Sequence, residues 1–262
     1  MRKENWIYVW SFLLLSSCVT TPITGRSALI LIPFGQEIAL GTQAYRDILN
    51  KEKISSDKKS NIILKRVGQR IAAVSSMPGL NWEFKLIESE QQNAFALPGG
   101  KVAFYTGILK ICKNEAGMAA VMGHEVAHAI ARHGAQRMTQ QLLITAGLTA
   151  ASISLSDNHH RKIIMGALGV GSTIGLTLPY SRGNESEADQ IGIIYMAKAG
   201  YDPKEAVNFW TRSKNAENIN PPEIFSTHPN NSRRIKKLTE LLPRAQREYH
   251  QAPIKYGTGE KF

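Results

Sequence analysis

Cysteine is scarce in this sequence, and long uncharged runs are few. Two cysteines among 262 residues are too few for the disulfide framework of a small secreted scaffold or for a four-cysteine zinc site. A mean hydropathy of −0.21 argues against a polytopic membrane protein, although it allows one or two apolar segments. Hydrophobic residues make up 43% of the chain, which excludes an intrinsically disordered protein. The length suits one large domain or two small ones with a real core.

Acidic residues are also in short supply. The chain has 21 Asp and Glu against 32 Lys and Arg, which leaves a formal net charge of +11. This charge allows nucleic acid, anionic lipid or an acidic protein as a partner and selects none of them. We expect no nucleic-acid partner, because the sequence has no recognisable nucleic-acid-binding motif and begins with an export signal.

Residues 1–17 are predicted to be a signal peptide. Two basic residues precede the apolar run Trp6–Leu15, which has the length of a signal-peptide core. The run leads into small residues and Cys18, an ending that resembles the lipobox of bacterial lipoproteins and makes Cys18 the expected lipidation site. The alternatives are an ordinary secretory signal or an anchor helix, neither of which requires that cysteine. By resemblance to Gram-negative lipoproteins, Val19 favours the periplasmic side of the outer membrane.

The mature chain is predicted to hold one domain. Residues 18–33 contain Thr, Pro and Gly and are expected to form a lipidated tether, residues 34–250 the domain, and residues 251–262 a loose C-terminal tail. Hydrophobic periodicity predicts helices over 34–54, 60–74, 114–130, 184–199 and 232–242, another helix opening at residues 202–203, and strands over 82–88, 93–97 and 102–106.

Two stretches, 138–156 and 163–181, carry no formal charge and reach the length of a membrane span. Both are diluted by Gly, Ser, Thr or Gln, and small residues also serve close helix packing. We therefore predict an apolar helical hairpin over 138–181 beside the active site, acting as a lid or a membrane-facing flap. Two spanning helices are the alternative, which the polar composition disfavours.

The sequence His124-Glu125-Val126-Ala127-His128 points to metal chemistry. On a helix, the two histidines share one face and can reach one metal ion, for which zinc requires neutral nitrogen donors and a third protein ligand. Glu125 lies about 100° round the helix, where it can hold a water molecule. The alternative is a pair of surface histidines, but the apolar surroundings indicate burial, and buried polar groups need partners.

A second acidic cluster offers the third ligand. Glu185 and Asp189 lie one turn apart on a predicted helix, whereas Glu187 points elsewhere. This spacing allows Glu185 to bind the metal and Asp189 to hydrogen-bond the far nitrogen of a metal-bound histidine. A solvated acidic face has the same spacing, so the pattern leaves both interpretations open.

Together these motifs resemble the HtpX/CAAX-prenyl-protease family of gluzincin zinc metallopeptidases, and within it the BepA-like periplasmic lipoprotein proteases. The resemblance extends to about Leu242. Further segments that carry it are Pro22–Arg26, Asn93–Ala96, Pro98–Gly100, Ala131–Gly134, Tyr180–Arg182 and Thr227–Pro229. It implies an α+β, mainly α-helical fold: a zincin-like metalloprotease domain with a small mixed β-sheet beside the HExxH helix and one Zn²⁺ per chain.

The resemblance also implies roles for individual residues. The implied zinc ligands are His124, His128 and Glu185, the implied catalytic residues are Glu125 and Asp189, and the implied substrate-binding residues are Asn93, Ala94, Phe95 and Ala96. His228 either takes the fourth zinc position or stabilises the oxyanion, unless it only shapes a loop. His133 is expected to end a helix, and His159 and His160 to form an exposed loop pair.

The expected activity is zinc-dependent hydrolysis of peptide bonds in misfolded or stalled envelope proteins, with Glu125 activating a zinc-bound water. The alternative is a chaperone or assembly factor for outer-membrane proteins with a latent protease site plugged by His228. The expected partners are unfolded or misassembled envelope proteins, the membrane through the N-terminal lipid, and outer-membrane assembly machinery.

Overall fold

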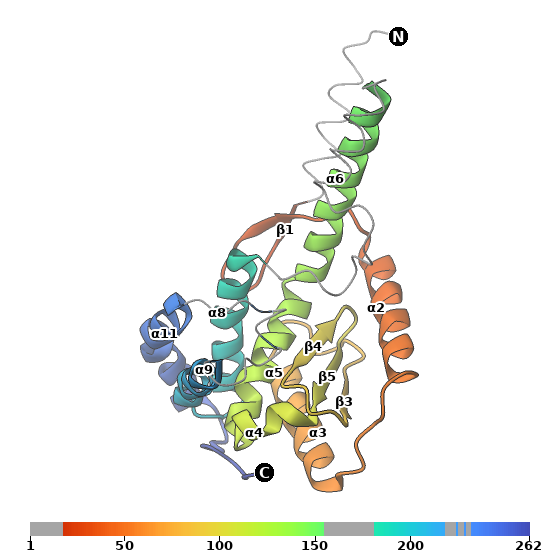
Figure 1. Cartoon of the computed structure of the whole chain (residues 1–262). Helices are drawn as coiled ribbons and strands as arrows, with labels where there is room; N and C mark the ends of the chain where they lie inside the picture. Colours follow the sequence, from red (N-terminus) through yellow and green to blue (C-terminus); the bar gives the residue numbers. More distant parts are fainter. Residues whose placement is uncertain (1–17, 155–180, 218–223, 225–227, 229–231) are drawn as a thin grey trace.

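A computed structural model describes residues 18–154, 181–217, 224, 228 and 232–262. These residues form a mainly α-helical structure with a small mixed sheet (Figure 1), which confirms the predicted fold class. The helices are α2 (Phe34–Leu49), α3 (Lys58–Ala73), α4 (Leu109–Cys112), α5 (Glu115–Ile130), α6 (His133–Ser154), α8 (Arg182–Lys198), α9 (Lys204–Glu217) and α11 (Ser232–Gln251). A 3₁₀ turn, η1 (Thr106–Ile108), precedes α4.

The sheet has three strands, β3 (Glu83–Ile87), β4 (Ala94–Leu97) and β5 (Lys101–Tyr105), in the order β3-β5-β4. The central strand β5 pairs parallel with β3 and antiparallel with β4. Two glycines with φ of 83° and 79° form the tight connection between β4 and β5, a conformation that glycine adopts without strain. The three predicted strands are therefore present, with β4 at one edge of the sheet.

Helix α5 lies at the centre of the core. Its N-cap is Asn114, whose side chain accepts a hydrogen bond of 2.8 Å from the Gly117 N–H. Helix α8 packs closely against it where Gly123 faces Gly192. A Cβ atom on Gly192 would lie 2.8 Å from the carbonyl carbon of Gly123, so neither position has room for a side chain. This contact brings the HExxH helix against the helix that carries Glu185.

The prediction that residues 18–33 form a separate tether is wrong. β1 (Cys18–Thr20) pairs antiparallel with β2 (Ser27–Leu29), and the turn between them packs on α8. Thr21 is 4% exposed and donates a hydrogen bond to Glu187. Threonine, proline and glycine are typical of linkers, but here the threonine hydroxyls bind a buried carboxylate of a distant helix, which fixes the segment in place.

The C-terminal tail, predicted to be loose, is also docked. The N–H groups of Glu115 and Ala116 donate to the carbonyls of Glu260 and Thr258, at 2.8 and 3.0 Å. The ring of Tyr256 lies 3.5 Å from the guanidinium carbon of Arg70. The first N–H groups of a helix have no acceptor within it, and the tail supplies acceptors to α5.

The last helix also differs from its predicted end at Leu242. Helix α11 continues through Pro243 to Gln251, because its apolar face continues as well: Leu238 and Ala245 are both fully buried. Helix α2, in contrast, ends at Leu49, before the predicted residue 54.

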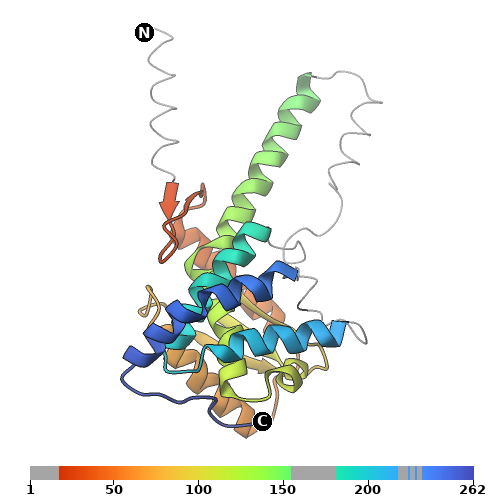
Figure 2. The same ribbon diagram turned by 90° about the vertical axis from the view of Figure 1, so that its left-hand side faces the viewer.

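Helix α6 corresponds to the first arm of the predicted hairpin and starts earlier, at His133. Its first turn lies beside the end of α5, and the remainder projects away from the body of the protein (Figures 1 and 2). The second arm, together with His159 and His160, falls almost entirely outside the described residues. Among the described helices, none is long and apolar enough to cross a membrane.

Candidate metal centre

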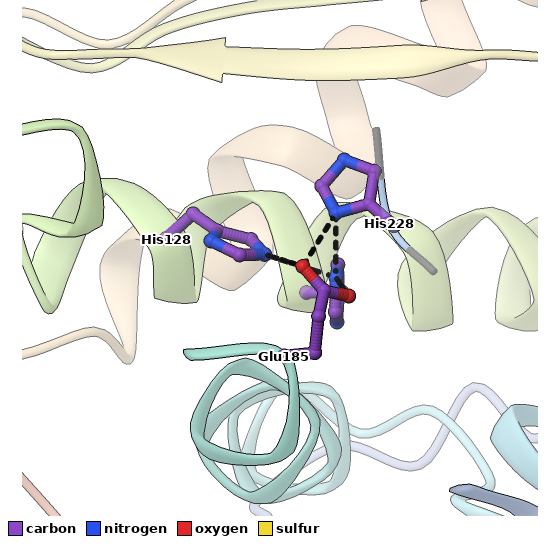
Figure 3. Close-up of side chains that lie close together, drawn as sticks. His128, Glu185 and His228 are labelled. Atoms are coloured by element: carbon purple, nitrogen blue, oxygen red, sulfur yellow. Dashed lines mark hydrogen bonds and ion pairs between the residues drawn. The ribbon is translucent and has the colours of Figure 1, made fainter. Parts of the chain in front are cut away.

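Four side chains from three parts of the chain converge on one point (Figure 3). They are His124 and His128 from α5, Glu185 from α8, and His228 before α11. Figure 3 labels His128, Glu185 and His228. One possible ligand atom from each lies within 4.8 Å of the others, and none of the four residues is more than 4% exposed. The structure therefore brings together the residues that the resemblance implied as ligands.

The spacing of these atoms suits a small metal ion. The Nε2 atoms of His124 and His128 are 3.0 Å apart, and each lies 3.3 Å from a carboxylate oxygen of Glu185. Donor atoms bound about 2.05 Å from a tetrahedral zinc ion are about 3.3 Å from one another. Two imidazoles and a carboxylate are also donors that zinc prefers, so the set fits a zinc ion in both chemistry and distance.

His228 faces the same point. Its Nδ1 atom lies 3.2 Å from Nε2 of His124 and 3.1 Å from Oε1 of Glu185. Buried Ile224 contacts His228: its carbonyl accepts a hydrogen bond of 2.7 Å from the His228 N–H, and its own N–H donates to the Gln92 carbonyl at 3.1 Å. The geometry thus allows His228 to be a fourth donor. Thr227 and Pro229, its neighbours in the predicted motif, are not among the described residues.

Glu125 lies beside the cluster and is 1% exposed. Its carboxylate accepts a hydrogen bond from the backbone N–H of Ala96. Among the described residues, the one contact of Oε1 is an ion-pair contact of 3.4 Å with His228 Nε2. Burial raises the pKa of the Glu125 carboxyl to about 7, against the lowering effect of His228. A carboxyl group with a pKa near neutrality can both accept and return a proton.

The predicted contact between Asp189 and a ligand histidine is present. Oδ1 of Asp189 lies 2.9 Å from Nδ1 of His124. The contact holds the ring so that Nε2 faces the cluster. Although burial and the nearby Arg234 lower the pKa of His124, its contacts with Asp189 and Glu185 outweigh them and raise it.

Arg234 is a residue of the site that the sequence analysis missed. One of its terminal nitrogens lies 2.7 Å from Oδ1 of Asp189 and 3.1 Å from Oε2 of Glu185, and also contacts the ring of His124. The side chain is 3% exposed, and its guanidinium carbon lies 3.5 Å from the ring centre of Trp210. One feature of the sequence could have indicated that Arg234 is buried. It lies four residues before buried Leu238, and this spacing places it on the apolar face of α11.

These neighbours determine the charges of the carboxylates. Burial alone would raise the pKa of Glu185, but hydrogen bonds with His124 and His128 and a charge interaction with His124 hold it far below its usual range. Burial would also raise the pKa of Asp189, but the charge of Arg234 outweighs the effect of burial, and the pKa of Asp189 is lowered. Both carboxylates are therefore ionised. Burial also lowers the pKa of His128 well below its usual range, so this imidazole is neutral.

The expectation that His133 ends a helix is wrong. A positive φ of 54° at Arg132 turns the chain after α5, and His133 then begins α6 with no exposed surface. Its Nδ1 lies 2.9 Å from Nδ1 of His128, and its Nε2 lies 3.0 Å from Oε2 of Glu187. Burial lowers the pKa of His133, so this imidazole is neutral too. Glu187 points away from the cluster, as predicted, but it is buried.

The residues predicted to bind substrate lie along the edge strand β4 and just before it. Ala94 and Ala96 are buried on the side of α5, and Phe95 packs on Tyr105 with 6.1 Å between ring centres. Asn93 accepts a hydrogen bond of 3.0 Å from the Tyr105 N–H. Figure 3 shows a strand of the sheet running across the cluster, so backbone groups border the site.

A pair of histidines one turn apart on a buried helix, a glutamate between them and a carboxylate from a second helix define a metallopeptidase of the zincin class. The chain belongs to peptidase family M48, whose sequence model matches residues 58–242. The predicted family is therefore confirmed.

Curated relatives come from mitochondria and from bacteria. The mitochondrial metalloendopeptidase OMA1 of Schizosaccharomyces pombe is 37% identical over 232 residues, covering 86% of this chain and 66% of that protein. OMA1 of Saccharomyces cerevisiae is 31% identical over 252 residues, covering 88% and 71%. The beta-barrel assembly-enhancing protease of Escherichia coli is 27% identical over 220 residues, covering 81% and 45%. The chain thus spans about two thirds of these fungal relatives and less than half of this bacterial one.

Proposed function

We propose that this protein is a zinc-dependent endopeptidase. The observation that carries the proposal is the buried cluster of His124, His128 and Glu185 with the carboxyl group of Glu125 directly beside it. The names of the relatives, metalloendopeptidases and proteases, support the same activity.

His124, His128 and Glu185 would hold the zinc ion, which would supply a Lewis acid for polarising the scissile carbonyl and acidifying a water molecule. Glu125 accepts the proton of the attacking water and passes it to the leaving amine, a role that suits its pKa. The Ala96 N–H holds the Glu125 carboxylate in place. Asp189 keeps the proton of His124 on Nδ1, on the side away from the cluster.

The substrate is proposed to bind as an added strand along the edge of β4, from Asn93 to Ala96. Main-chain hydrogen bonds would then provide much of the binding, which suits a protease that accepts many sequences. We infer that its substrates are misfolded or stalled envelope proteins. The support is the predicted export signal together with the bacterial relatives, which are named for β-barrel assembly.

Replacing the general base tests the activity. Glu125→Gln should bind zinc as the wild type does and lose cleavage of an unfolded protein substrate by about 10²–10⁴-fold. Glu205→Gln is the matched control, because Glu205 is buried in α9 next to Arg212, outside the cluster. Cleavage by Glu125→Gln at the rate of the control, with equal zinc content, would rule out the assignment.

The location is a separate part of the proposal. We propose a lipoprotein on the periplasmic side of the outer membrane, anchored through Cys18, on the basis of the lipobox-like sequence. β1 begins at Cys18, so a lipid there would be attached directly to the folded domain. A Cys18→Ser variant with a cleavable signal should wash off membranes, whereas the wild type should stay bound. Retention of the variant would argue against a lipid anchor.

The second candidate is an assembly factor for outer-membrane proteins with a latent protease site. The position of His228 favours it, because a fourth protein donor would close the coordination that the reaction needs open. In that case His228→Ala should raise the rate of cleavage. A lower rate at unchanged zinc content would instead support a role for His228 in stabilising the oxyanion.

A further inference from the structure

We propose that the turn Thr21–Arg26 positions the metal ligand His128 through Glu187 and His133. The inference rests on the proposed function, because it takes His128 as a zinc ligand. It assigns a positioning role to Glu187, His133 and the turn, although none of them is among the four residues that could bind the metal.

The carboxylate of Glu187 is buried, at 3% exposure, and its main partners come from the N-terminal turn. Oε1 accepts hydrogen bonds from the hydroxyls of Thr21, at 2.5 Å, and Thr24. Oε2 accepts from Nε of Arg26 at 2.6 Å and is 3.0 Å from Nε2 of His133. An ionised carboxylate accepts about four hydrogen bonds, so these four partners satisfy it.

This arrangement fixes where the ring protons lie. Glu187 can only accept, so Nε2 of His133 carries the proton, and Nδ1 of a neutral His133 is then an acceptor. Nδ1 of His128 faces that acceptor at 2.9 Å and must therefore be the donor. Nε2 of His128 is left without a proton, with its lone pair toward Glu185, which is the state a metal requires.

The two ligand histidines are thus oriented by carboxylates of one helix, α8. Asp189 contacts His124 directly, whereas Glu187 reaches His128 through the ring of His133. The second path is longer and depends on residues far away in sequence: Thr21 and Glu187 are 166 positions apart. The path therefore ends in the segment that directly follows Cys18.

The turn itself is held firmly. The Thr21 N–H donates to the Arg26 carbonyl at 2.8 Å, and Arg26 also binds the side chains of Gln136 and Asn184, at 2.8 and 3.2 Å. Displacing the segment from α8 would remove three donors from Glu187 and release His133. The turn that follows Cys18, the proposed attachment site, is thereby linked to the metal ligand His128 by a continuous chain of hydrogen bonds.

Zinc release from the full chain to a chromogenic chelator tests whether the turn positions His128 through Glu187 and His133. Glu187→Ala and His133→Phe should speed zinc release by about 10–100-fold, the usual effect of losing a partner of a metal ligand. Thr21→Val combined with Thr24→Val, which nearly preserves shape, should speed it several-fold. The visible absorption of the Co²⁺-loaded protein should change in each variant, because it reports ligand geometry.

Glu115→Ala is the matched control. Glu115 is also a buried glutamate with several donors, Arg66, Arg70 and Tyr201, but it lies at the far end of α5. The Glu115→Ala substitution should lower the melting temperature without changing zinc release or the Co²⁺ spectrum. Wild-type release and spectra in folded Glu187→Ala and in the double threonine variant would overturn the inference. Absence of zinc from the wild type would instead refute the proposed function.

Discussion

The Nδ1 atom of His124 lies 2.9 Å from Oδ1 of Asp189, although 65 positions separate the two residues. The contact exists because α5 and α8 touch backbone to backbone, so a carboxylate on one helix reaches an imidazole on the other. A metal ligand is therefore oriented by packing between helices as much as by its own side chain.

Loss of this carboxylate should weaken metal binding. Asp189→Asn keeps the shape of the side chain but removes the charge that compensates Arg234 and stabilises the Nδ1 proton of His124. We expect zinc affinity to fall by about 10–100-fold in a chelator competition assay. Asp202→Asn, at a half-buried position just before α9 and outside the cluster, should leave the affinity unchanged, and equal affinities of the two variants would contradict the assigned role.

The contact between the helices gives a second prediction. A methyl group on Gly192 would meet the backbone of Gly123 and His124 at 2.8 Å, so Gly192→Ala must push α5 and α8 apart. Overpacking of this kind lowers the free energy of unfolding by about 1–3 kcal/mol. Zinc affinity should fall with it, because Glu185 moves away from the histidines.

Gly35→Ala serves as the control for this substitution. Gly35 lies in α2, and a Cβ atom there would meet nothing within 4 Å. The free energy of unfolding of the Gly35→Ala variant should rise by up to about 1 kcal/mol, because alanine is the better helix former. Chemical denaturation of both variants measures the difference, and equal stabilities would show that the helices can separate without cost.

The pH dependence of cleavage follows from Glu125. The carboxylate must be ionised to accept a proton, and burial raises its pKa to about 7. A bound cation lowers that pKa, so the midpoint of the acid limb should lie at or below 7. Below the midpoint, kcat/KM should fall about tenfold per pH unit. A profile that stays flat on the acid side down to the pH at which zinc itself is lost would exclude Glu125 as the base.

The docked C-terminus should contribute to stability. Ending the chain at Gln251 removes two acceptors from the start of α5 and the packing of Tyr256 on Arg70. With about 1 kcal/mol for each hydrogen bond and a similar amount for the ring, the loss is about 2–4 kcal/mol. Thermal and urea unfolding should show it. Ile254→Ser, at a 57% exposed position of the same segment, should change stability by less than about 0.5 kcal/mol.

Short-range periodicity explains what could be predicted at the site. His124 and His128 share a face because they lie four residues apart on one helix, and the same spacing relates Glu185 to Asp189. The cap at Asn114 also depends on neighbours alone. Each of these features is set within one element, so the sequence contains the information that it requires.

The missed features depend on contacts between distant segments. Arg234 belongs to a basic helix, and only its place on the buried face distinguishes it from its exposed neighbour Arg233. Glu187 was correctly placed away from the cluster, but nothing local indicates that Thr21 would bind it. The C-terminal tail has a loop-like composition, and its partners at the start of α5 become visible only in the fold.

The buried position of Arg234 has a consequence for the metal-free protein. When ionised, Glu125, Glu185 and Asp189 carry three negative charges, and Arg234 supplies one positive charge beside them. A divalent cation brings the site to electrical neutrality. Without it, the protein must either hold two unbalanced charges out of water or take up protons at groups with a raised pKa, namely Glu125 and His124. Zinc binding should therefore release protons into solution and make the folded chain harder to unfold.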